Sequence, residues 1–240
     1  MQIQGPDDQE NATEFEVLSR LLPLPGARLL ELGCGAAEKT RQIAENAKID
    51  EIVAVEIDLI QHAKNLKITD LPSVTFKSFG AEAIDEPDDS FDIVLMFKSL
   101  HHVPKAEMDT ALSEIHRVLK PGGLAYISEP VFAGSFNEVI RLFHDESTVR
   151  LAAFEAVARA VGEKTLELAD EIFFTSAFKL KHFGQFEAGV LNVTHTDHQL
   201  TPEILQAVKN KFESYRSDEG YLFETPNRVD LLRKPVGVSV

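Results

Sequence analysis

Short apolar runs alternate with helical stripes along the first half of the chain. The runs cover residues 29–32, 52–55, 74–76, 91–97 and 124–128. Such largely apolar runs are typical of strands buried on both faces of a parallel sheet. The clearest helical stripe combines Met108, Ala111, Leu112, Ile115, Val118 and Leu119. This alternation predicts an α/β fold with a mostly parallel sheet.

The second half of the chain has a less regular pattern. Helical stripes extend from Phe136 to about Asp170, and a further helix is predicted from its N-cap Thr201 to Tyr215. Residues 172–196 are rich in Phe, Val and Thr and predict one or two strands without fixed boundaries. The segment 220–235 is predicted to contain the last strand.

A glycine turn follows the first apolar run. Gly33 permits a tight turn, and Gly35 lets a ligand approach the backbone where a side chain would block it. The N-terminus of the helix predicted from Glu38 would face a negative group of that ligand. A purely structural turn is the alternative. A dinucleotide fingerprint is disfavoured, because it needs a small residue where Glu38 stands.

Two acidic residues follow the second apolar run. Glu56 lies 21 residues after Gly35, near the distance at which cofactor-binding α/β folds place an acid on ribose hydroxyls. A carboxylate can accept hydrogen bonds from both hydroxyls. We therefore predict Glu56 as the ribose acceptor, with a solvated strand end as the alternative, and Asp58 as the cap of the next helix.

Composition narrows the class of protein. The 240 residues, 44% of them hydrophobic, can supply one core, and the net charge of −15 argues against a nucleic-acid partner. Cys34 is the only cysteine, so no intrachain disulfide can form, and a small buried residue is favoured over a catalytic thiol. Because the chain has no apolar leader and no run of about 18 apolar residues, we predict a soluble, cytoplasmic protein without a membrane span.

Three motifs resemble those of one enzyme family. The sequence Glu31-Leu-Gly-Cys-Gly35, with Ala37 in the place of a third glycine, resembles motif I of the class I S-adenosylmethionine-dependent methyltransferases. The stretches 81–92 and 114–123 resemble the ubiquinone/menaquinone-biosynthesis (methyltransferase type 11) group, the second one as Glu-Ile-His-Arg-Val-Leu-Lys-Pro-Gly-Gly. The resemblance extends from Arg28 to Pro130.

The resemblance implies a Rossmann-like fold with a seven-stranded, mostly parallel sheet flanked by helices. It implies a single S-adenosylmethionine-binding domain over residues 1–240. Within it, residues 10–130 would form the cofactor-binding core, 131–200 a helical lid or substrate insertion after the fifth strand, and 201–240 a C-terminal helix and strand. Plain packing of the inserted helices against the sheet is the alternative to a lid.

The resemblance also implies the residues that hold S-adenosyl-L-methionine. They are Glu31, Gly33, Cys34, Gly35, Glu56, Ile57, Gly80, Ala81, Glu82 and Phe97. One of them departs from the family pattern, because the aspartate that bonds the adenine amino group falls on Gly80. Backbone N–H groups of Ala81 and Glu82, or the Glu82 side chain, are the alternative partners.

The methyl group of the cofactor, and with it the methyl acceptor, is expected to face residues 97–102. His101 and His102 are the predicted catalytic bases, since neutral imidazole suits proton abstraction near pH 7, and Glu129 is a second candidate. Local backbone hydrogen bonds are the alternative role for both histidines. Further polar residues could line a pocket, namely His144, His182, His195, Asp197 and His198. The set formed by His195, Asp197 and His198 is a poor metal site, so no metal is predicted.

Three function classes remain at this point. The favoured one is methyl transfer to oxygen, nitrogen or carbon of a small-molecule acceptor (EC 2.1.1.-). A protein that binds the cofactor without catalysis is the second class, because Gly80 replaces the expected aspartate. An NAD-dependent oxidoreductase is the third, and Glu38 argues against it. The acceptor and the oligomeric state are not encoded in any motif.

Overall fold

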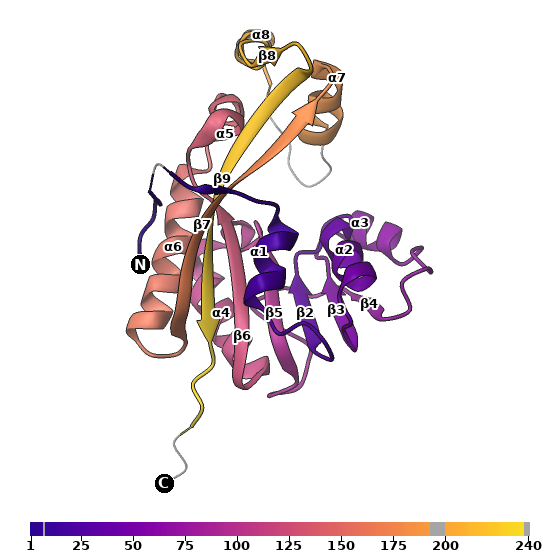
Figure 1. The fold of residues 1–240 in the computed structure, drawn as a ribbon, viewed down its shortest axis with the longest axis vertical. Coiled ribbons are helices and arrows are strands. Elements are labelled where there is room, and N and C mark those ends of the chain that lie inside the picture. Colours follow the sequence, from indigo (N-terminus) through magenta and orange to yellow (C-terminus); the bar gives the residue numbers. More distant parts are fainter. Residues whose placement is uncertain (7, 193–199, 238–240) are drawn as a thin grey trace.

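The computed structural model describes residues 1–6, 8–192 and 200–237 of the chain. Over these residues, nine strands form one sheet in the order β1-β7-β9-β6-β5-β2-β3-β4, with β8 paired to β9 (Figure 1). Their bounds are β1 (Glu10–Asn11), β2 (Arg28–Leu32), β3 (Glu51–Val55), β4 (Val74–Lys77), β5 (Phe91–Phe97), β6 (Leu119–Pro130), β7 (Glu167–Leu180), β8 (Arg216–Ser217) and β9 (Gly220–Arg233).

Seven of these strands make the predicted sheet. Strands β2 to β6 pair in parallel, whereas β9 runs antiparallel to both β6 and β7. The prediction of a seven-stranded, mostly parallel sheet is therefore confirmed. The two-residue strands β1 and β8 are additions that the apolar pattern does not show, because both are exposed.

Helices flank the sheet. Their bounds are α1 (Glu14–Leu21), α2 (Glu38–Asn46), α3 (Leu59–Asn65), α4 (Met108–Val118), α5 (Gly134–Ile140), α6 (Ser147–Gly162), α7 (Phe183–Phe186) and α8 (Pro202–Glu213). Short 3₁₀ turns at 100–102 and 105–107 precede α4, and a π-helical turn at 187–191 follows α7. No helix among the described residues is both long and apolar enough to cross a membrane.

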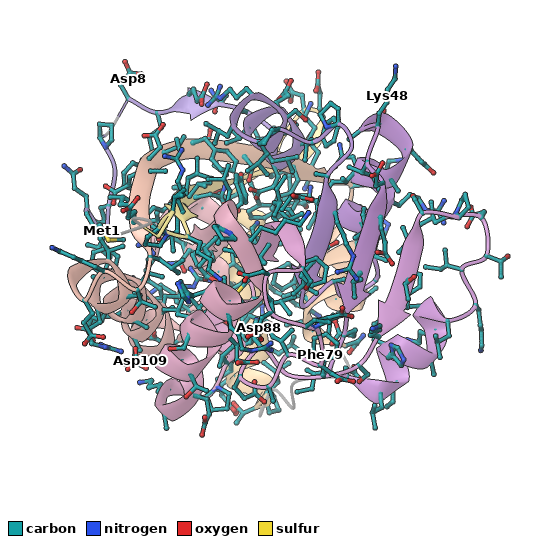
Figure 2. All side chains as sticks on the ribbon, turned by 90° about the horizontal axis from the view of Figure 1, so that it is seen from below. Met1, Asp8, Lys48, Phe79, Asp88 and Asp109 are labelled. Carbon is teal, nitrogen blue, oxygen red and sulfur yellow. The ribbon has the colours of Figure 1, made fainter. Side chains whose placement is uncertain are left out.

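Strands β2, β3 and β5 are buried on both faces, as their largely apolar sequences require. On one face, Leu30 and Val94 belong to the core cluster of α4 and α6; on the other, Leu29 and Ile93 belong to that of α1 and α2. Figure 2 shows side chains filling the space between the sheet and these helices. Since α6 packs on the sheet, its helical stripe is explained by core packing.

Strands β7 and β9 continue beyond the sheet as a two-stranded ribbon (Figure 1). Around its far end lies a separate aromatic cluster, to which α5, α7 and α8 contribute. Its buried aromatic side chains are Phe186, Phe212, Tyr221 and Phe223. The segment predicted as a lid is thus divided, because α6 joins the main core and α5 joins the aromatic cluster. A lid role for residues 131–200 stays a prediction.

Candidate functional site

A pocket lies at the carboxyl end of β2, where the strand order reverses. The chain runs from β2 to β3 and β4 on one side of the sheet, and then to β5 and β6 on the other. Ligands of open α/β sheets bind at such a switch point. The pocket measures about 340 Å³ and is lined by Glu31, Gly33, Cys34, Gly35, Ala36, Glu38, Lys39 and Phe97. Five predicted cofactor residues therefore line one pocket.

The two glycines of the turn serve different needs. Gly33 has a φ of +78°, and a Cβ there would lie 2.7 Å from the Cβ of Ser99. Gly35 has a φ of +53°, and a Cβ there would meet nothing within 4 Å. Gly33 is thus required by the protein's own packing. The space beside Gly35 stays open, as expected where a ligand approaches backbone.

The backbone amides of the turn bind within the protein. Gly33 and Cys34 both donate to the carbonyl of Val55, over 2.9 and 2.8 Å. Gly35 donates to Oε2 of Glu56 over 2.8 Å. These three amides are therefore engaged in holding β2 and β3 together.

Glu56 lies beside the glycine turn, as its spacing predicts. Its Oε1 accepts a hydrogen bond from the amide of Asp58 over 2.8 Å, so both carboxylate oxygens hold backbone. Each oxygen keeps a second lone pair, and the ribose role stays a prediction. The cap at Asp58 is confirmed, because Asp58 Oδ1 accepts from the amides of Ile60 and Gln61.

Glu31 lies buried at the floor of the pocket with 1% of its surface exposed. Burial raises the pKa of Glu31 to about 7, although the hydroxyl of Thr40, which donates to Oε2 over 2.7 Å, acts in the opposite direction. Burial and the carboxylates of Glu31 and Glu56 also raise the pKa of the Cys34 thiol. The thiol thus stays protonated, which supports its role as a small buried residue.

Glu82 covers the position where the family pattern is broken. A Cβ built on Gly80 would collide with the carboxylate of Glu82. The Glu82 carboxylate therefore lies where a side chain of residue 80 would begin. Ile57, also predicted to contact the cofactor, is 65% exposed, whereas Ala81 is buried.

A histidine–carboxylate cluster lies beyond β5 and β6. We define it as His101, His102, Glu129, Glu146 and Arg150. Glu129 accepts from the amide of Leu100 over 2.9 Å with Oε1, and its Oε2 contacts Nδ1 of His101. Oε1 of Glu146 lies 3.6 Å from Nε2 of His101, and Arg150 donates to Oε2 of Glu146 over 2.6 Å.

The carboxylates set the charge of this cluster. Burial opposes protonation of His101, but Glu129 and Glu146 outweigh it and raise the pKa of His101 to about 9. Burial likewise opposes the charge of Glu146, yet His101 and Arg150 hold the pKa of Glu146 well below its usual range. His102 is exposed, and its ring centroid lies 4.2 Å from that of His101.

Several residues of the site were not predicted from the sequence. Glu146 and Arg150 lie one helical turn apart at the start of α6, a spacing that signals an ion pair but not its partner His101. Asn65 donates to the carbonyl of Gly35 over 2.8 Å. His182 precedes α7 at the far end of the ribbon (Figure 1). His195, Asp197 and His198 lie outside the described residues.

Comparisons with known proteins show what the first half of the chain is similar to. A methyltransferase-domain family matches residues 29–123. The 27-O-demethylrifamycin SV methyltransferase of Amycolatopsis mediterranei is 33% identical over 127 residues, 48% of this chain and 46% of that protein. The ubiquinone/menaquinone biosynthesis C-methyltransferase of Shewanella oneidensis is 31% identical over 126 residues, 50% of this chain and 49% of that protein. The chain thus spans about half the length of these relatives.

A solved structure extends the likeness of fold to nearly the whole chain. A methyltransferase-like protein of Bacillus halodurans superposes with a TM-score of 0.64 and 19% identity, and the match covers 92% of this chain and 99% of that one. At this identity the likeness concerns the fold. The segments after Pro130 therefore belong to the same architecture.

Proposed function

We propose that the chain transfers the methyl group of S-adenosyl-L-methionine to a small-molecule acceptor, because residues 29–123 match a methyltransferase-domain family and the relatives include methyltransferases. One observation carries the proposal. The pocket at the switch point between β2 and β5 brings Glu31, the glycine turn and Phe97 together.

The pocket suits a cofactor that carries positive charge. Glu38 lines the pocket and Glu56 holds the Gly35 amide beside it, and the sulfonium and amino groups of S-adenosylmethionine are cationic. The open space over Gly35 leaves room for close approach. We propose Glu56 for the ribose and Glu82, in place of a side chain at Gly80, for the adenine end.

When bound, the cofactor supplies an electrophilic methyl group, so the protein has to orient an acceptor and exclude water. Phe97 lines the pocket, and the chain continues from it to His101. We therefore place the acceptor between the pocket and the histidine–carboxylate cluster. This edge of the sheet carries buried polar groups, since Glu129 is 3% and His101 5% exposed.

The two predicted bases differ in their surroundings. Both ring nitrogens of His101 face carboxylates, Nδ1 toward Glu129 and Nε2 toward Glu146. His101 is thus committed to the cluster, and His102 is the imidazole of the pair that solvent reaches. We propose that His101 positions the turn at 100–102 and that His102 acts at the acceptor end.

Calorimetry with S-adenosylhomocysteine, S-adenosylmethionine and NAD tests the cofactor. We expect binding of both sulfur compounds and none of NAD, whereas binding of NAD alone would refute the proposal. A screen of small hydroxyl, amine and carbon-acid acceptors with labelled cofactor then tests catalysis. Tight cofactor binding with no transfer to any acceptor would favour a binding protein of the same fold.

The charge of the chain and its single cysteine bear on the acceptor and on the cellular compartment. The net charge of −15 disfavours a phosphate backbone as the acceptor. The free, buried Cys34 is compatible with a reducing compartment such as the cytoplasm.

A further inference from the structure

We propose that His101, His102 and Glu146 bind one divalent transition-metal ion at the acceptor end of the site. The two histidines and the carboxylate each offer one ligand atom, and these atoms lie within 4.8 Å of one another. The residues come from the turn after β5 and from the residue before α6. They are thus brought together by the tertiary structure.

The neighbours of the cluster orient its ligand atoms. Glu129 contacts Nδ1 of His101, and the opposite nitrogen, Nε2, is directed toward Glu146. A carboxylate on one imidazole nitrogen with the metal on the other is the common arrangement of histidine ligands. Arg150 engages Oε2 of Glu146, so Oε1 is the oxygen directed toward the histidine.

Binding would draw the three ligand atoms, which lie within 4.8 Å of one another, closer together. A tetrahedral site with bonds of about 2.0 to 2.1 Å places its ligand atoms roughly 3.3 Å apart. Oε1 of Glu146 is 3.6 Å from Nε2 of His101, and it also pairs with Nε2 of His144 over 3.1 Å, a contact that a bound ion would replace. His102 is exposed, and its ring centroid lies 4.2 Å from that of His101, so the two imidazoles are already side by side.

The donor set selects the class of ion. Two imidazoles and one carboxylate suit Zn²⁺, Co²⁺ or Fe²⁺, whereas Mg²⁺ and Ca²⁺ prefer oxygen ligands. The carboxylates of Glu129 and Glu146 counter the charge of the ion, although Arg150 already pairs with Glu146. Three protein ligands leave coordination positions for water or a substrate oxygen.

The metal would define the acceptor, and this step rests on the proposed function. Because the acceptor is placed between the cofactor pocket and the cluster, the ion would lie on the side of the acceptor that faces away from the pocket. The substrate class is then a hydroxyl-bearing molecule whose oxygen binds the ion, which lowers the pKa of that hydroxyl. His102 would serve as a ligand in this state and not as a free base.

Titration of chelator-treated full-length protein with Co²⁺ tests the site. We expect saturable binding with visible d–d bands that report nitrogen and oxygen ligands. The variant His102→Ala, which alters an exposed side chain, should weaken Co²⁺ binding at least about tenfold. Glu129→Gln should weaken it about 10- to 100-fold through the orientation of His101. His116→Ala on α4, outside the cluster, should bind Co²⁺ as the unmodified protein does.

Two results would overturn the metal site: absence of saturable Co²⁺ and Zn²⁺ binding, or equal affinity of His102→Ala and the unmodified protein. The cluster would then be an ion-pair network alone. Calorimetry with S-adenosylhomocysteine on the same samples separates the two proposals. Cofactor binding without metal binding refutes only the metal site, and metal binding without cofactor binding refutes only the proposed function.

Discussion

The buried carboxyl group of Glu31 makes a quantitative prediction about stability and pH. Burial raises its pKa from 4.5 to about 7 in the folded protein. The folded state therefore keeps a proton on Glu31 that the unfolded chain loses, so rising pH favours unfolding over this window. The contribution of Glu31 to the free energy of unfolding is therefore fully present below about pH 4.5 and is lost as the pH rises to about 7. A difference of about 2.5 pKa units corresponds to roughly 3 kcal/mol.

The perturbation is Glu31→Gln, which keeps the shape of the side chain and can still bond the Thr40 hydroxyl. Glutamine does not ionise, so the variant should not lose unfolding free energy as the pH rises through this window. Relative to the unmodified protein, its free energy of unfolding should increase by roughly 3 kcal/mol between about pH 4 and pH 8. Other carboxylates titrate equally in both proteins and cancel in the difference.

Urea unfolding of both proteins at several pH values within this window measures the difference. Glu163→Gln, at an exposed position after α6, serves as the control and should show no such dependence. A difference between Glu31→Gln and the unmodified protein that stays constant from about pH 4 to pH 8 would refute the argument. Glu31 would then ionise in the folded state as it does in the unfolded chain.

Three further predictions concern the turn, the ribose acceptor and the aromatic cluster. Gly33→Ala should lose at least about 2 kcal/mol of unfolding free energy, because it forces a side chain onto a left-handed backbone and against Ser99. Gly26→Ala, at φ +73° with open space around it, should lose only about 1 to 2 kcal/mol, the cost of the backbone conformation alone. Equal losses in urea unfolding would contradict this. Glu56→Ala should weaken S-adenosylhomocysteine binding by at least about 1.5 kcal/mol in calorimetry, and should also reduce stability, because the amides of Gly35 and Asp58 lose their acceptor. Unchanged affinity would move the ribose contact elsewhere. Phe212→Ala should cost roughly 3 to 5 kcal/mol of stability and leave cofactor affinity nearly intact, since Phe212 belongs to the aromatic cluster and not to the pocket. A parallel loss of cofactor affinity in calorimetry would show that the aromatic cluster supports the pocket.

Local sequence determines the elements whose causes lie within a few residues. The strands β2, β3 and β5 are predictable because burial on both faces demands largely apolar runs. The cap at Asp58 is predictable because its partner amides are two and three residues away. The glycine turn and its pocket follow from the same logic, since a strand, two glycines and a helix specify a place where backbone meets ligand.

Tertiary structure decides what depends on residues far apart in the chain. Strand β7 gave a mixed pattern because one 14-residue strand crosses from the sheet core to the aromatic cluster, with a register shift at Leu168. The role of α8 in that cluster depends on the ribbon of β7 and β9, which no local pattern shows. His101 meets Glu146 only because α6 packs beside the turn after β5, so its charge and partners are properties of the fold. Short-range hydrogen bonds and burial patterns are determined by neighbouring residues in the sequence. The electrostatics of a buried cluster instead depends on every group that folding brings near it.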